Sequence, residues 1–192
     1  MKKRHFNIAA IVMAAAVLVG CETVEDMTGI SLASKGPTVC PDISILANAS
    51  EKTAFRAGAG RDLIDILYEA EISGVTVGCD YDLDSDTTAG TLSVSITPFF
   101  AAERGAANST GLADVSYFVA VTDQDKKIIN KQTFSVSFGF QGNVTRARFG
   151  DTPVQMTLPI KAGRDGRDYL IYAGFQLSRE QMDYNARKKA RR

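Results

Sequence analysis

Apolar and polar side chains alternate along most of the chain after residue 40, and this period of two limits the possible folds most strongly. Successive side chains of a β-strand point to opposite faces, so such a run predicts a strand with one buried side. We expect strands at residues 43–47, 63–72, 75–83, 92–96, 115–121, 134–140, 154–160 and 169–177. Polar segments between them, most of which contain glycine, predict turns at residues 84–90, 104–111, 122–127, 141–143 and 163–166.

The longest alternating run changes phase once. Even-numbered apolar residues up to Ile72 share one face, whereas odd-numbered ones continue from Val75 to Leu83, after Ser73 and Gly74. An extra residue at a glycine is typical of a β-bulge or a strand break. About seven antiparallel strands, with polar turns between them, predict a β-sandwich of the immunoglobulin or fibronectin type. An up-and-down barrel is the alternative.

The first residues of the chain predict an export signal. Three basic residues precede an apolar run over residues 6–20, which is shorter than the roughly 20 residues of a membrane-spanning helix. The run ends in Leu18-Val19-Gly20-Cys21 and resembles the lipobox of bacterial lipoproteins. The resemblance implies that residues 1–20 are a signal peptide and that Cys21 becomes the acylated first residue, which anchors the chain in a lipid bilayer. An ordinary secretory signal before an incidental cysteine is the alternative.

Glu22 follows the predicted lipidation site, and the residue at this position helps to predict whether the anchor lies in the inner or the outer membrane. In the Gram-negative lipoproteins that the signal resembles, an aspartate here commonly retains the protein in the inner membrane. The resemblance therefore implies an outer-membrane lipoprotein that faces the periplasm. Residues 21–39 contain few large apolar side chains and predict a flexible tether ahead of a β-sandwich domain at residues 40–177.

Three stretches of the predicted mature chain resemble uncharacterised envelope lipoproteins of Gram-negative bacteria. They are residues 55–72 (FRAGAGRDLIDILYEAEI), 117–123 (YFVAVTD) and 173–187 (AGFQLSREQMDYNAR). This second resemblance implies a place in the cell envelope and supplies no activity.

Loss of the signal peptide would remove the only histidine, His5, and leave Cys40 and Cys79 as the two cysteines without a lipid. In an oxidising compartment such a pair predicts a structural disulfide. A redox-active thiol pair is the alternative, but the sequence has no C-x-x-C. A mature chain without histidine excludes Ser-His-Asp and Cys-His sites, so we expect a non-enzymatic protein without a cofactor.

Four aspartates, Asp80, Asp82, Asp84 and Asp86, recur at every second position and have the spacing that opens an EF-hand loop. Ser85 stands where that loop needs glycine, and Thr91 stands where it needs a bidentate glutamate. We therefore expect an acidic strand end that leads into a turn. A weak Ca²⁺ or small-ligand site is the alternative function.

Glu69 and Glu71 lie two residues apart, so their side chains leave the same strand face about 6.6 Å apart. That separation suits the carboxylate pair of an inverting glycosidase. The chain has no tryptophan to stack on a sugar, and two carboxylates on a solvated face need no catalytic explanation. A carboxylate-dependent hydrolase is therefore our third hypothesis.

Residues 178–192 predict a short basic helix. Ser178 and Gln181 have the spacing of a capping box, and Met182, Ala186 and Ala190 form one apolar stripe. We expect the basic side chains to contact anionic lipid headgroups or an acidic envelope protein: Arg179, Arg187, Lys188, Lys189, Arg191 and Arg192. A solvated, fraying helix is the alternative.

These features together predict a membrane-anchored binding or assembly module of the cell envelope, with an unknown envelope protein as its partner. Basic and acidic residues balance at 22 each, so the charge predicts no affinity for nucleic acid.

Overall fold

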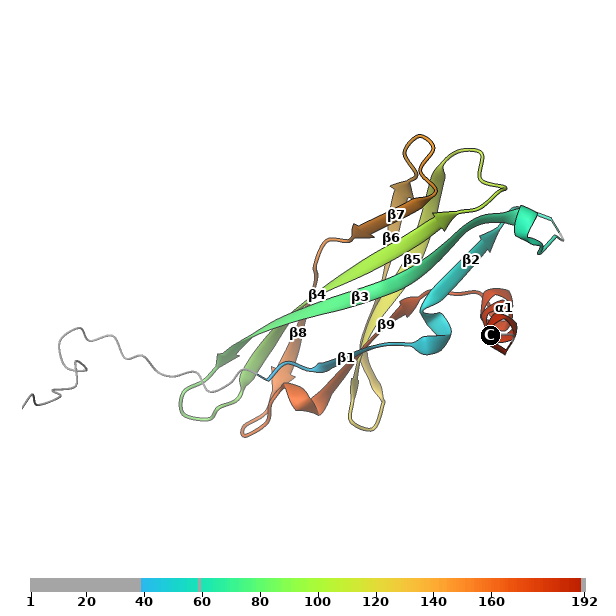
Figure 1. Cartoon of the computed structure of the whole chain (residues 1–192). Helices are drawn as coiled ribbons and strands as arrows, with labels where there is room; N and C mark the ends of the chain where they lie inside the picture. The colour runs from blue at the N-terminus through green and yellow to red at the C-terminus, as the bar shows by residue number, and fades with distance from the viewer. Residues whose placement is uncertain (1–38, 59, 191–192) are drawn as a thin grey trace, which may run out of the picture. The chain divides into compact units, whose positions relative to one another are not determined.

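The computed structural model describes residues 39–58 and 60–190 (Figure 1). Nine strands and one α-helix lie in this part of the chain, together with three short 3₁₀ helices at Ala47–Ala49 (η2), Leu63–Asp65 (η3) and Gly166–Asp168 (η4). The strands are β1 (Asp42–Ile45), β2 (Glu51–Phe55), β3 (Ile66–Leu83), β4 (Gly90–Arg104), β5 (Leu112–Asp123), β6 (Ile128–Gly139), β7 (Arg146–Gly150), β8 (Val154–Ile160) and β9 (Tyr169–Phe175), and the helix is α1 (Arg179–Ala190).

The strands form two sheets. A four-stranded sheet has the order β1-β9-β5-β6, and a five-stranded sheet has the order β2-β3-β4-β7, with β8 also paired to β4. All neighbours are antiparallel except β1 and β9, which run parallel. The predicted β-sandwich is confirmed, with more strands than expected and one parallel pair. Two separate sheets also distinguish it from the up-and-down barrel.

The core lies between the sheets, where the inward side chains of β4 meet those of β5 and β9. Phe100 of β4 contacts Tyr117 of β5 and Phe175 of β9, with ring centroids 5.2 and 5.9 Å apart. All three rings are buried, as are the β4 side chains Leu92, Val94 and Ile96 and the β5 side chains Val115, Val119 and Val121. The alternation of the sequence therefore builds the two inner faces.

The phase change in β3 is a register shift in a continuous strand. The pairing of β3 with β4 slips between Ile72 and Gly74, which confirms the predicted bulge. The first half of β3 is flanked by β2, and the β4 segment opposite it is flanked by β7. The other half of β4 pairs with β8. The long β3–β4 hairpin therefore joins both parts of the five-stranded sheet (Figure 1).

Some predicted strand limits are wrong. Leu63 and Ile64 are 79% and 68% exposed and belong to η3, because Asp62 and Asp65 form a capping box that bends the chain there. The strand therefore begins at Ile66, and β9 ends before Leu177. Strands β2 and β7 were not expected, and each has only five residues.

The predicted Cys40–Cys79 disulfide is confirmed and joins the chain just before β1 to β3, with the two Cα atoms 5.7 Å apart. Tyr81, two residues further along β3, donates a hydrogen bond from its hydroxyl to the Val39 carbonyl at 2.6 Å. The same hydroxyl oxygen accepts one from the Gly166 N–H at 2.6 Å. These contacts fix the start of the described chain against β3.

Helix α1 begins with the predicted capping box. The Gln181 N–H donates to Ser178 Oγ, and the Ser178 N–H donates to Gln181 Oε1, at 3.2 and 2.9 Å. The predicted apolar stripe is wrong as a packing face, because Met182 is 51% exposed and Ala186 and Ala190 are also exposed.

The helix packs instead through a face that carries Tyr184, Asn185 and Lys188. The Tyr184 ring meets Phe55 of β2 edge-on, with centroids 5.0 Å apart. Asn185 is 4% exposed, and its Nδ2 donates to the Glu51 carbonyl at 2.8 Å. The helix therefore covers β2 through aromatic and polar contacts.

Candidate functional site

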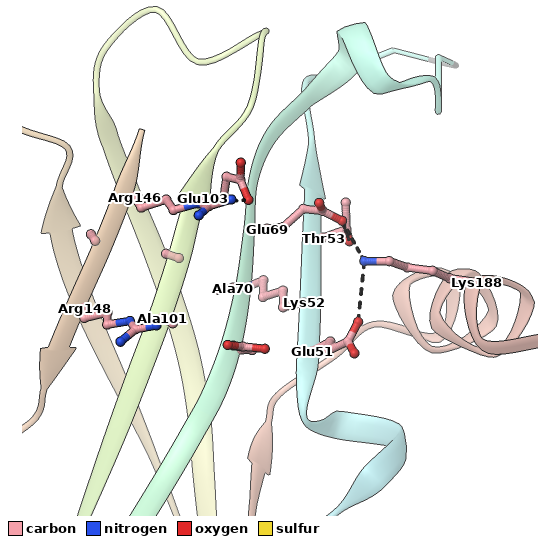
Figure 2. Close-up of a pocket in the computed structure, with 13 residues that line it drawn as sticks. Glu51, Lys52, Thr53, Glu69, Ala70, Ala101, Glu103, Arg146, Arg148 and Lys188 are labelled. Carbon is pink, nitrogen blue, oxygen red and sulfur yellow. Dashed lines mark hydrogen bonds and ion pairs between the residues drawn. The ribbon is translucent and has the colours of Figure 1, made fainter. Parts of the chain in front are cut away.

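A hollow of about 350 Å³ lies on the outer face of the five-stranded sheet, beside α1 (Figure 2). Its floor consists of residues from β2, β3, β4 and β7, and Lys188 of α1 closes one side. We call this hollow the charged groove. Its lining residues are Glu51, Lys52, Thr53, Glu69, Ala70, Glu71, Ala101, Ala102, Glu103, Arg146, Ala147, Arg148 and Lys188.

Strand register brings the charged residues of the groove into two rows across the sheet. One row reads Thr53, Glu69, Glu103 and Arg146, and the other reads Glu51, Glu71, Ala101 and Arg148. Residues that pair across neighbouring strands share a face, so each row lies on the side away from the core. Each row contains two glutamates and ends at an arginine on β7.

The α1 side of the groove is an ionic cluster. Lys188 Nζ lies 2.7 Å from Glu69 Oε1 and 3.4 Å from Glu51 Oε2 (Figure 2). The buried Thr53 hydroxyl also donates to Glu69 Oε1, at 3.2 Å. Desolvation lowers the pKa of Lys188, but the hydrogen bond and charge of Glu69 and the charge of Glu51 raise it to a net value above normal. This cluster therefore fixes α1 on the sheet.

The β7 side of the groove is more open. Arg146 Nε lies 3.7 Å from Glu103 Oε2. In the next row, neither the Glu71 side chain nor the Arg148 side chain has a hydrogen bond or ion pair with any residue that the structure describes. Ala101 lies between them, so their Cα atoms are two strand spacings apart, about 10 Å. A carboxylate and a guanidinium thus flank a short side chain, and both can bind a ligand.

The structure places Glu69 and Glu71 on this same face, but in different surroundings. Glu69 is engaged by Lys188 and Thr53, whereas Glu71 is exposed. The cation paired with Glu69 comes from the C-terminal helix, not from a neighbouring strand. The arrangement is suited to ionic recognition.

The four aspartates do not converge. Asp80 and Asp82 are exposed on β3. Asp84 organises the following turn, because its Oδ1 accepts hydrogen bonds from the Asp86 N–H at 3.1 Å and the Thr87 N–H at 2.8 Å. Hydrogen bonds from Thr87, and then from the Asp86 backbone, lower the pKa of Asp84. Across residues 39–58 and 60–190, no three His, Cys, Asp or Glu side chains group to hold a metal ion.

The basic residues of the C-terminal segment have different roles. Arg179 and Arg187 are exposed, whereas Lys188 is 25% exposed and is directed into the charged groove. Lys189 donates a hydrogen bond to the Ala47 carbonyl. Lys188 and Lys189 therefore make contacts within the fold, and the contact of the basic segment with an anionic surface or an acidic partner stays a prediction. Arg191 and Arg192 lie outside the described residues, as do Cys21 and the predicted signal peptide and most of the tether.

The sequence prediction missed the groove residues Glu51, Glu103, Arg146 and Arg148. A signal for β7 was present in Arg146-Ala147-Arg148-Phe149, because charged and apolar residues alternate there. Its position beside β4 depends on sheet pairing, which the local pattern does not specify.

Comparison with known proteins gives no family. No family model matches the chain, and no curated protein matches it. One solved structure that it resembles is the variable (V) domain of the Streptococcus agalactiae AgI/II polypeptide BspA, with 13% identity and a TM-score of 0.18. The alignment covers 70% of this chain and 77% of that one. In the described part of this chain, no helix has the length and apolar character needed to cross a membrane.

Proposed function

We propose that this chain is a lipid-anchored protein of the cell envelope whose β-sandwich is a non-enzymatic binding module. The observation that supports this most directly is the pair Glu71 and Arg148, which flank Ala101 in the charged groove and whose side chains have no hydrogen bond or ion pair with another described residue. Opposite charges at fixed positions on a sheet suit a ligand that carries both charges.

The ligand that best matches this pair is a short peptide with a free amino group and a free carboxylate. Its ammonium binds Glu71, its carboxylate accepts two hydrogen bonds from the Arg148 guanidinium, and its backbone lies over Ala101. Exposed ion pairs contribute about 0–1 kcal/mol each, so binding is weak for a minimal peptide and rises with further contacts.

The anchor in this proposal rests on the sequence. Acyl chains on Cys21 hold the domain at the periplasmic face of the outer membrane, and the exposed Arg179 and Arg187 contact anionic headgroups or an acidic partner. Mass spectrometry of the N-terminal peptide from native membranes tests the anchor. A diacylglyceryl mass on Cys21 supports it, and an unmodified Cys21 contradicts it.

The binding proposal is tested by NMR titration of the full chain in detergent micelles with triglycine. We expect saturable shifts at Glu71, Ala101 and Arg148. Triglycine that is acetylated and amidated at its ends should cause none, because it lacks both charges. Glu71→Gln and Arg148→Gln should each weaken binding several-fold.

Arg164→Gln is the matched control, because Arg164 lies in the turn before η4, outside the lining of the groove. Equal shifts with the capped and free peptides would contradict ionic recognition. Loss of binding in Arg164→Gln would contradict the assignment to the groove.

A further inference from the structure

The edge strands of the sandwich differ in how they are protected against pairing with another chain. Short length, proline, charge and a covering helix all discourage such pairing. β1 has four residues, β2 is covered by α1, β7 carries two arginines, and β8 contains Pro159. Residues 74–83 of β3, which pair with β4 alone, carry two aspartates.

β6 lacks these protections. It has 12 residues, no proline and no acidic residue, and Lys131 is its only charge. It pairs with β5 on one side, and the described chain places no strand on its other side. A long edge with a single charge is a template for strand addition.

Hydrogen bonds at the end of β5 show which backbone groups of β6 face this open edge. The Phe140 N–H donates to the Gly111 carbonyl at 2.7 Å, so the backbone N–H of Phe140 is directed towards β5. Ser116, which pairs with Ser135, instead accepts a hydrogen bond from the Gln176 N–H, beside β9. Backbone direction alternates along an antiparallel strand, so Ser135 and the other odd-numbered residues between 131 and 139 present their N–H and C=O groups outward.

The side chains of β6 divide in the same way. Phe134, Val136 and Phe138 are directed towards the core but are only partly buried. The Phe138 ring lies 4.5 Å from that of Phe149 on β7, so this apolar strip extends to the other sheet. Ser135 and Ser137 are exposed on the outer face. The open edge therefore combines free backbone groups with incompletely covered aromatic rings.

We infer that β6 is a dimerisation strand, which pairs antiparallel with β6 of a second copy about a two-fold axis at Val136. In this register Val136 faces Val136 of the other copy, Phe134 faces Phe138, and Ser135 faces Ser137. The two serines form a hydrogen-bonded backbone pair, because both are odd-numbered.

The register follows from the chemistry of β6. Because odd-numbered residues must bond to odd-numbered ones, the even-numbered apolar residues face one another. Centring the axis on Val136 sets all three partly buried apolar side chains against apolar ones, and such cross-strand pairs stabilise a sheet. Centring it on Phe134 would set Phe138 against Asn130. No charge lies within residues 133–139, so self-pairing brings no like charges together.

The pairing also produces a closed assembly of two copies. A two-fold contact uses the open edge of both copies, and the remaining edges are short, charged or covered. The product is a dimer with one continuous eight-stranded sheet, and it leaves the charged groove on the other sheet unoccupied. This inference is independent of the proposed peptide binding.

Cysteine crosslinking of the full chain in detergent tests both the pairing and its register. Val136→Cys should give a covalent dimer on mild oxidation, because directly opposed Cβ atoms lie about 4.5–5.5 Å apart. Ser135→Cys and Ser137→Cys should crosslink when mixed. Each alone should not, because their own copies lie diagonally, about 7–8 Å apart. The wild-type chain is the control that measures any crosslinking through Cys21 itself.

Charge substitution gives a second test, by sedimentation of the same chain. Ser135→Lys and Ser135→Glu should each shift the chain towards monomer, and an equal mixture of the two should restore the dimer. Restoration would exclude misfolding as the cause. Ser93→Lys, at an exposed position of β4, is the control and should remain dimeric.

Three results would overturn the inference. One is a wild-type chain that stays monomeric at every concentration tested. Another is a dimer that survives both Ser135 variants. The third is crosslinking of Ser135→Cys with itself but not with Ser137→Cys, because that would require another register.

Discussion

The ammonium of Lys188 lies between two carboxylates that belong to different strands. It comes from a segment rich in basic residues, yet it is only 25% exposed and contacts Glu51 and Glu69. Its neighbour Arg187 is exposed. Neighbouring cations in one helix therefore have different roles, depending on the face they occupy.

Replacing Lys188 with methionine should lower the free energy of unfolding by about 1–2 kcal/mol, because two carboxylates would then share a partly desolvated site without a cation. Urea unfolding measures the loss. Arg187→Met removes the same charge from an exposed position and should change stability by less than about 0.5 kcal/mol. Equal losses in both variants would show that net charge, and not the ionic cluster, matters.

The raised pKa of Tyr68 predicts how the free energy of unfolding depends on pH in the alkaline range. Burial, and then the negative charge of Asp114, raise the pKa of Tyr68 to about 12 from 10.0. The unfolded chain therefore loses this proton at lower pH than the folded chain does. Its contribution to stability is complete below pH 10 and declines as the pH rises to about 12.

Tyr68→Phe should flatten this alkaline decline, as measured by urea unfolding at a series of pH values. Tyr68 also donates a hydrogen bond to the Asp114 carbonyl, so the variant should lose about 1 kcal/mol at neutral pH. Tyr172→Phe serves as the control tyrosine. If the free energy of unfolding of Tyr68→Phe declined with alkaline pH as steeply as that of the wild type, the decline would not be due to Tyr68.

At the scale of elements, α1 is held by a face that its apolar pattern does not indicate. Tyr184→Ala should lower the free energy of unfolding by about 1–2 kcal/mol, because it removes the edge-on contact with Phe55. Met182→Ala, on the exposed stripe, should change it by less than about 0.5 kcal/mol. Thermal or urea unfolding of both variants measures the difference, and the reverse order would mean that the helix docks through its stripe.

Sequence patterns predicted those elements whose burial depends on one clear period. The core strands and the bulge of β3 followed from alternating large apolar residues and from the glycine at the phase change. β2 was not predicted because the positions that pair with the core residues Ala70 and Tyr68 are Lys52 and Ala54, which give no strong apolar signal. The charged groove could not be predicted, because it is assembled by pairing between distant strands and by the docking of α1. Local periodicity specifies neither.

At the scale of the whole molecule, the Cys40–Cys79 bridge closes a loop over a separation of 39 residues. On the chain-entropy model, its removal should lower the free energy of unfolding by about 4 kcal/mol. Urea unfolding of the Cys40→Ala/Cys79→Ala double variant measures this. Cys21→Ser leaves the bridge intact and is the control. A difference below about 1 kcal/mol would mean that the reduced, unfolded chain keeps that loop closed.

The same bridge also determines how the domain bears mechanical load. Cys40 immediately precedes β1, whose four residues pair in parallel with β9. Without the bridge, a pull on the chain ahead of Cys40 would pass along β1 and shear it from β9. With the bridge, tension enters β3 at Cys79 through a covalent bond, and the long β3–β4 ladder carries it. The oxidised domain therefore keeps its parallel β1–β9 pair under a pulling force that would shear the pair apart in the reduced domain.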